Sequence, residues 1–154
     1  MTPHVATLVP PDVHALFGKI YGAVSRLPDL DLGTDRRGTP VPISCHALAR
    51  AAARVFALPY VDGLFLGRFS HSWLRTPDRK WIIDCYPVGI LAGPLLVDAA
   101  GGLSPGALLY KPVHARRVSK DLPFAAPPFR RAVRRLERAL AVLANGGILS
   151  PAQG

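Results

Sequence analysis

The sequence predicts an α+β fold, with helices at both ends of the chain and an antiparallel sheet between them. Apolar residues recur at helical spacing near each end, whereas the middle holds three short runs rich in aromatic and β-branched residues, separated by turn residues. A chain of 154 residues, 49% of them hydrophobic, can bury one ordinary core. We therefore expect a single domain over residues 1–154, with loose ends at 1–10 and 147–154.

Two helices are expected in the first part of the chain. The first follows an apolar stripe in residues 13–24 and stops before Pro28. Residues 28–42 are rich in Gly, Pro, Asp and Thr, which is typical of a surface loop. Ser44 can cap the second helix, and Pro59 ends it.

The three short runs predict an antiparallel meander of strands. They cover residues 60–67, 71–76 and 80–86. A further strand is expected within 107–113, whereas the Gly- and Pro-rich residues 87–106 receive no assignment. The last helix is expected over 129–145, because an Asn-Gly-Gly segment, a typical helix stop, closes it.

The chain is strongly basic, with a formal net charge of +9 and a pI near 10.4. Such a charge attracts acidic partners, nucleic acid among them. Five arginines fall on the last helix: Arg130, Arg131, Arg134, Arg135 and Arg138. A solvated helical face is the simpler interpretation, because no zinc-finger spacing, Gly-rich phosphate loop or aromatic strand signature accompanies them. Nucleic acid stays open as a partner of this helix and is not favoured.

No targeting or membrane segment is expected. The N-terminus lacks a basic stretch followed by an unbroken apolar one, and Gly93, Pro94 and Asp98 interrupt the most apolar later segment. Two cysteines do not make a disulfide framework, so a reducing compartment, the cytoplasm, is expected. Both thiols are then free for chemistry.

Cys45 is the first candidate for a functional residue. It opens the second expected helix, where unpaired N–H groups and the positive end of the helix dipole lower a thiol's pKa from about 8.5. The thiolate is the useful nucleophile. Taken alone, Cys45 is better explained by core packing, because free cysteines are commonly just packed.

His71 and Asp84 strengthen the case, because they follow Cys45 in the order of a base and its orienting carboxylate. An even-numbered turn between their strands puts them on one face of the sheet, as direct or diagonal neighbours. Pro77 favours a four-residue loop over 77–80, which is an even number. An odd-numbered loop separates the two residues. Each of them taken alone is explained as well by a strand-end structural role.

Cys45 at a helix start, His71-Ser72-Trp73 and Trp81-Ile82-Ile83-Asp84 together resemble the core of the transglutaminase-like superfamily, over about a quarter of the chain (residues 44–86). The resemblance implies a papain-like core, in which the nucleophile helix packs on an antiparallel sheet. It also implies a Cys-His-Asp triad: Cys45 as nucleophile, His71 as general base and later acid, and Asp84 as the group that orients His71. It implies no cofactor.

Three further residues are assigned to substrate contact: Trp73, His46 and Tyr86. Trp73 shares the face of His71, where a core role is the main alternative. His46 is expected at the surface or rim and is a poor base for Cys45, because neighbours on a helix point about 100° apart. Cys85 should point away from Asp84 and pack in the core, because strand neighbours alternate.

A zinc site is not favoured. Potential ligands are present, but no C-x-x-C or H-x-x-x-H pair supplies two of them from one turn. We therefore expect no metal.

The first hypothesis for function is a cysteine-dependent hydrolase of the peptidase or glutamine deamidase type, which acts on an amide or isopeptide bond of a protein or peptide through a thioester. The alternatives are an acyltransferase that passes the acyl group to an amine, a noncatalytic binding module that uses the basic C-terminal helix, and an accessory protein that matures a peptide product. The sequence leaves the substrate and the oligomeric state open.

Overall fold

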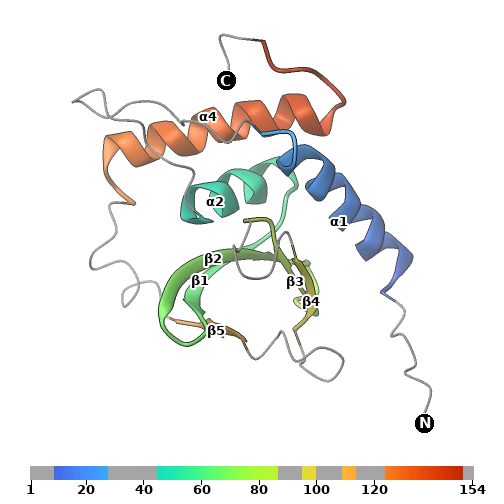
Figure 1. Cartoon of the computed structure of the whole chain (residues 1–154), viewed down its shortest axis with the longest axis vertical. Coiled ribbons are helices and arrows are strands. Elements are labelled where there is room, and N and C mark those ends of the chain that lie inside the picture. Colours follow the sequence, from blue (N-terminus) through green and yellow to red (C-terminus); the bar gives the residue numbers. More distant parts are fainter. Residues whose placement is uncertain (1–8, 28–44, 87–94, 100–108, 114–123, 151–154) are drawn as a thin grey trace.

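The computed structural model describes residues 9–27, 45–86, 95–99, 109–113 and 124–150. Within these ranges it is an α+β protein, as predicted, with helices gathered on one side of a curled antiparallel sheet (Figure 1). The helices are α1 (Pro11–Val24), α2 (Cys45–Val55) and α4 (Pro127–Ala144). The strands are β1 (Tyr60–Phe65), β2 (Phe69–Arg75), β3 (Trp81–Asp84), β4 (Leu95–Asp98) and β5 (Tyr110–Pro112).

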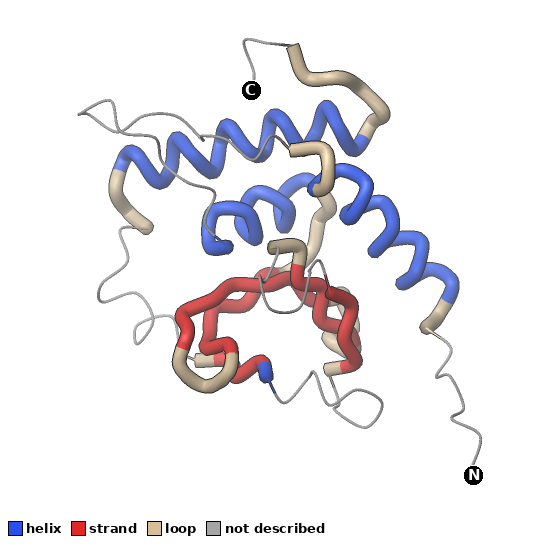
Figure 2. Tube along the Cα trace, viewed as in Figure 1, coloured by secondary structure: helices blue, strands red, loops and turns tan. Residues whose placement is uncertain are grey.

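The sheet has the strand order β4-β3-β2-β1-β5, and every neighbouring pair is antiparallel. The sheet is curled: its edge strands, β4 and β5, bend toward each other on the side away from the helices, as the red tube in Figure 2 shows. Gly63 on β1 permits the close approach of β5, because a Cβ at this position would lie 2.3 Å from the Lys111 carbonyl oxygen and 2.5 Å from the Trp73 ring.

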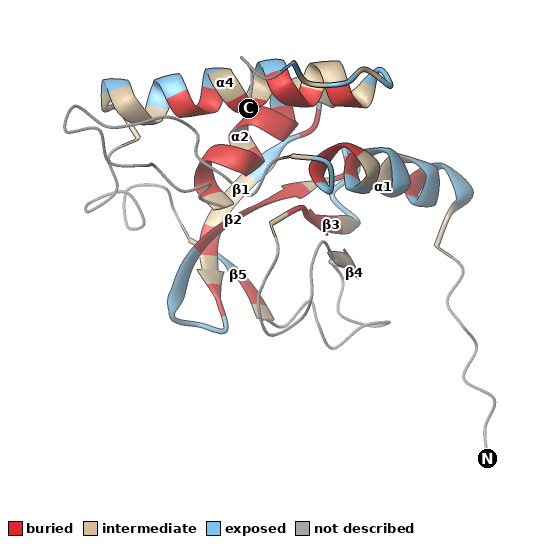
Figure 3. Ribbon diagram, turned by 45° about the horizontal axis from the view of Figure 1, so that its top comes forward, coloured by how far each residue is buried: buried red, intermediate tan, exposed pale blue. Residues whose placement is uncertain are grey.

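The two faces of the sheet carry separate cores. Leu74 and Ile83 face the helices and join the main core, which also includes Leu48, Leu136 and Leu140. A smaller cluster lies on the opposite face: Phe65, Trp73, Ile82, Val97 and Tyr110. Figure 3 shows that buried residues dominate α2 and the inner side of α4.

Most of the expected elements are confirmed. The helical stripes are buried where predicted, at Val13 and Ile20 in α1 and at Val133 and Leu136 in α4. The strand expected within 107–113 is β5. Cys85 is buried in the main core, as its position in the strand predicts.

Strand β4 was not predicted. It lies within residues 87–106, for which the sequence indicates no helix or strand. The surface loop over 28–42, the Ser44 cap and the outer parts of both expected loose ends lie outside the described residues; residues 147–150 carry no helix or strand. None of the described helices combines the length and the apolar character that a membrane span requires.

Candidate active site

Cys45 is the first residue of α2 and lies above the start of β2. Its Sγ atom is 4.0 Å from the Ser70 carbonyl oxygen, and the side chain is partly exposed. Burial alone would raise the pKa of the thiol, but hydrogen bonds and charge interactions with His46 and His71 outweigh it and lower the pKa from 9.0 to about 6. Cys45 is therefore an accessible thiol that ionises near neutral pH.

His71 and Asp84 meet through the register of the β2–β3 hairpin. Leu74 pairs with Ile83, and the Thr76 N–H donates to the Trp81 carbonyl at 3.0 Å, so the connecting loop is the four-residue 77–80 loop that the sequence predicts. This register puts Asp84 diagonal to His71 on the same face. His71 Nε2 lies 2.7 Å from Asp84 Oδ2.

Asp84 is fully buried and has three hydrogen-bond donors around it. Besides the His71 ring, the Tyr110 hydroxyl donates to Oδ2 at 2.8 Å and the Tyr86 N–H donates to Oδ1 at 3.2 Å. No local sequence pattern indicates Tyr110, because β5 reaches the site from 26 residues further along the chain than Asp84. Three donors fix the carboxylate, which in turn fixes the imidazole.

The His71 imidazole is held as a cation that faces the thiol. Burial would lower its pKa, but the hydrogen bond to Asp84 and the interactions with Cys45 raise it from 6.5 to about 9. Because Nε2 is bonded to Asp84, Nδ1 is the nitrogen available to Cys45. The site thus favours a thiolate and an imidazolium side by side.

Two of the residues assigned to substrate contact lie beside His71 and differ in exposure. Trp73 is 0% exposed and stacks 6.2 Å from the imidazole, so it supports the ring from the core and offers no surface to a substrate. The expected core alternative is the one that the structure supports. Tyr86 is partly exposed, with its ring edge toward the imidazole at 6.2 Å, where it can border a bound substrate.

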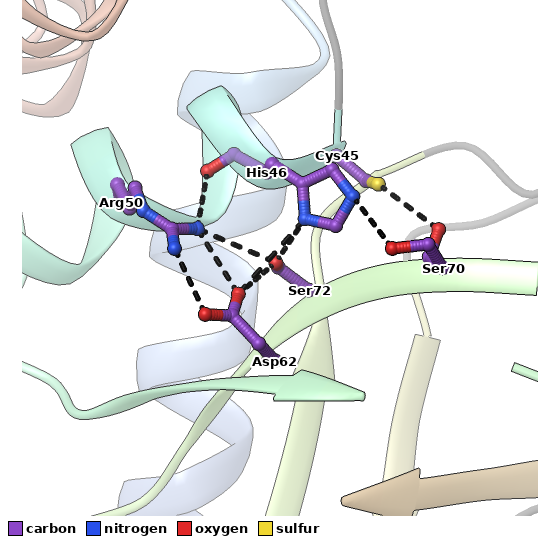
Figure 4. A network of polar contacts seen from close by, with 6 residues as sticks. All are labelled: Cys45, His46, Arg50, Asp62, Ser70 and Ser72. Atoms are coloured by element: carbon purple, nitrogen blue, oxygen red, sulfur yellow. Dashed lines mark hydrogen bonds and ion pairs between the residues drawn. The ribbon is translucent and has the colours of Figure 1, made fainter. Parts of the chain in front are cut away.

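His46 is buried, so the expectation of a surface or rim position is wrong. The Ser72 hydroxyl donates to Asp62, so it accepts the His46 Nδ1–H at 2.6 Å. His46 Nε2 lies 3.2 Å from the hydroxyl of Ser70, the residue that also contacts Cys45 (Figure 4). Polar side chains on β1 and β2 therefore draw His46 inward toward the thiol.

Asp62 and Arg50 complete this second network. Arg50 donates to both carboxylate oxygens of Asp62, at 2.8 and 3.1 Å, and to the His46 carbonyl oxygen at 3.2 Å. Burial would raise the pKa of Asp62, but His46, whose Nδ1 lies 3.9 Å from Oδ1, and hydrogen bonds from Arg50 and Ser72 hold it well below 3.8. Burial would lower the pKa of His46, but its interactions with Asp62 and Cys45 raise it above its ordinary value. Cys45 thus faces two imidazoles, each backed by a carboxylate.

Sequence reasoning missed Asp62, Arg50 and Ser72. One signal could have found them: Ser70 and Ser72 occupy alternate positions of a strand whose face toward α2 should be apolar. A hydroxyl buried on that face, as that of Ser72 is, requires polar partners on the helix and on the neighbouring strand. Asp62 is directly opposite Ser72 in the β1–β2 register.

Among the described residues, no three His, Cys, Asp or Glu side chains gather so that they could hold a metal ion. Comparisons of the chain with family models, curated proteins and solved structures gave no match. The chemistry of the site therefore follows from its geometry: a nucleophilic thiolate, an acid and base beside it, and a buried carboxylate that orients the base.

Proposed function

We propose that the chain is a cysteine-dependent hydrolase that cleaves an amide or isopeptide bond of a peptide or protein through a thioester, on a transglutaminase-like, papain-like core. The carrying observation is a partly exposed thiol whose pKa is lowered by interaction with two histidines, one of which, His71, has a ring nitrogen bonded to a buried carboxylate. Packing alone does not explain this arrangement. Cys85, which is only packed, has its pKa raised by burial and by the charge of Asp84.

The first half of the reaction forms the thioester. The Cys45 thiolate attacks the carbonyl carbon, the C–N bond breaks, and the His71 imidazolium gives its proton to the departing amine. Backbone N–H groups in the first turn of α2 point toward the same end of the helix as Cys45, where they can stabilise the negative oxygen.

The second half consumes water. Neutral His71 takes a proton from water, the oxygen attacks the thioester carbon, and the C–S bond breaks to return the thiolate and the imidazolium. Asp84 keeps Nε2 bonded throughout, so Nδ1 stays directed at the reacting atoms. Water is the simplest acceptor; an amine in its place gives acyl transfer. We put hydrolysis and glutamine deamidation first because they need no second substrate.

Alkylation tests the activated thiol. At pH 6, Cys45 should react with iodoacetamide at least about 10 times faster than glutathione, because its thiolate fraction is far larger. Mass spectrometry of the Cys45→Ala variant assigns the labelled residue, and buried Cys85 should stay unlabelled. A burst of p-nitrophenol from p-nitrophenyl acetate, stoichiometric with the protein, would detect the acyl-enzyme. Equal reactivity of Cys45 and glutathione at pH 6 refutes the proposal.

The pH profile of acylation should be bell-shaped. Cys45 must have lost its proton, which happens above about pH 6, and His71 must hold its proton, which it does below about pH 9. The initial rate of p-nitroaniline release from a peptide p-nitroanilide, whose departing amine needs a proton, should therefore be constant between these values and fall on both sides. A rate that rises without limit toward pH 10 would show that His71 donates no proton.

A further inference from the structure

A pocket opens between α2 and α4, beside the Cys45 site. Its volume is about 270 Å³. The walls include four arginines and two aromatic rings: Arg50, Arg54, Arg130, Arg134, Tyr60 and Phe124. We call it the arginine pocket. Sequence reasoning treated the arginines of the last helix as a solvated face, and it did not foresee that two of them line a cavity.

Two of these arginines form ion pairs, and the other two form none among the described residues. Arg50 donates to both carboxylate oxygens of Asp62, and Arg54 pairs with Glu137 at 3.0 Å. Arg130 and Arg134 are exposed, and within the described residues no acidic side chain pairs with either. Within the part of the chain that the structure describes, the arginine pocket therefore has two positive charges without an acidic partner, on one face of α4.

The walls suit a carboxylate carried on a carbon chain. The Arg50 guanidinium lies 4.6 Å from the Tyr60 ring centre and 4.0 Å from that of Phe124, which leaves flat apolar surfaces beside the cations. Ala53 and Val133 add aliphatic surface. A glutamate or aspartate side chain can pack its methylene groups there and place its oxygens on the free arginines.

Two residues of the pocket wall contact His46, the neighbour of Cys45 on α2. Arg50 lines the pocket and also donates to the His46 carbonyl oxygen, and the Phe124 ring lies 5.1 Å from the His46 ring. Along α2, Cys45 precedes Arg50 by about 7.5 Å and Arg54 by about 14 Å. An extended peptide covers this span in roughly two to four residues.

We propose that the arginine pocket binds an acidic side chain of a peptide substrate, two to four residues from the carbonyl that Cys45 attacks. The proposal rests on the proposed function for the reacting carbonyl, but the binding step can be measured without it. Nucleic acid is the alternative ligand of a basic helix. It would bind a row of arginines in the open, whereas the pocket is a single recess with apolar walls.

Matched charge reversals test the binding. The probe is a short fluorescein-labelled peptide of alternating Glu and Leu, and its affinity is measured by fluorescence anisotropy. The double variant Arg130→Glu with Arg134→Glu should raise Kd at least about 10-fold, because it removes two charge-assisted hydrogen bonds. The control is Arg131→Glu with Arg138→Glu: these arginines are exposed on the same helix, the pocket walls do not include them, and the change in net charge is the same. It should leave Kd within about twofold, since surface charges act weakly at a distance in salt.

A series of peptide chloromethyl ketones tests the spacing. The thiolate displaces chloride and forms a C–S bond to the peptide, and mass spectrometry reports the labelling rate at Cys45. Labelling should be fastest with Glu two to four residues from the ketone, and the pocket double variant should abolish that preference. Equal rates at every Glu position would overturn the spacing.

The outcomes separate the two proposals. Equal weakening by both double variants, or equal affinity for a Gln–Leu peptide, overturns the arginine pocket as a specific site, even when iodoacetamide still labels Cys45 rapidly. Tighter binding of a DNA oligonucleotide than of the Glu–Leu peptide, with both variants weakened alike, overturns it in favour of nucleic acid. An inert Cys45 together with a pocket-specific loss of peptide binding supports the pocket and refutes the hydrolase.

Discussion

Replacing Asp84 by Asn is expected to slow acylation of Cys45 by between about 10² and 10⁴-fold, in the range that the corresponding change causes in other triads. Asn has nearly the same shape, but it carries no charge to hold the imidazolium. The pKa of His71 should fall below about 9, because the charge of Asp84 is lost and only the interactions with Cys45 and a neutral acceptor remain to raise it. The alkaline limb of the bell-shaped profile then moves to lower pH. The rate of p-nitroaniline release from a peptide p-nitroanilide, measured from pH 5 to pH 10, checks both effects.

Tyr110→Phe is the matched control for this change. It removes one of the three donors to Asp84 and keeps the charge, so its effect should stay below about 10-fold. Circular dichroism and the melting temperature show whether both variants fold. An Asp84→Asn protein that folds and acylates at the wild-type rate would exclude Asp84 as the group that orients His71.

The strand parity of the hairpin was the most predictable part of this molecule. Period-two alternation and the preference of Pro77 for a type I turn are local properties, and together they fix the register that brings His71 to Asp84. Strand β4 was not predictable in this way. Its four residues follow the Gly93-Pro94 pair, and the ten residues between it and its partner β3 are rich in Gly and Pro, which gives no strand pattern or tight-turn signal to fix the register.

The candidate site likewise has a predictable local part and a part that depends on the tertiary fold. Cys45, His71 and Asp84 lie within one helix and one hairpin, where spacing and alternation reveal which residues meet. Tyr110 and Asp62 come from β5 and β1, and their hydrogen bonds depend on how the sheet curls and where α2 packs on it. The burial of His46 was not predicted, because the 100° step between helix neighbours does not show which polar side chains of the sheet will bind the ring. A buried Asp62 can reorient a histidine at the start of a helix.

Replacing Asp62 by Asn is expected to lower the free energy of unfolding by about 3–5 kcal/mol at pH 7. Asp62 and Arg50 form a bidentate pair, with side chains only 7% and 14% exposed. Asn leaves the guanidinium between two aromatic rings without its counter-charge, and also weakens the acceptor for Ser72. Urea unfolding followed by circular dichroism measures the loss. Ser72→Ala, which removes a single hydroxyl, should cost only about 1–3 kcal/mol and serves as the control.

The pH dependence identifies the charge as the cause. The native state holds the pKa of Asp62 well below 3.8, whereas the unfolded chain binds a proton near that value. Asp62 therefore stabilises the native state above about pH 4, and this contribution is lost as the pH falls below it. The Asn variant lacks this contribution, so its deficit relative to the wild type should shrink as the pH is lowered from 5 toward 2. A deficit that stays constant over that range would mean that lost packing, rather than lost charge, destabilises the variant. Because the same carboxylate acts on His46, the variant should also raise the pKa of Cys45 above 6, which slower alkylation at pH 6 would report.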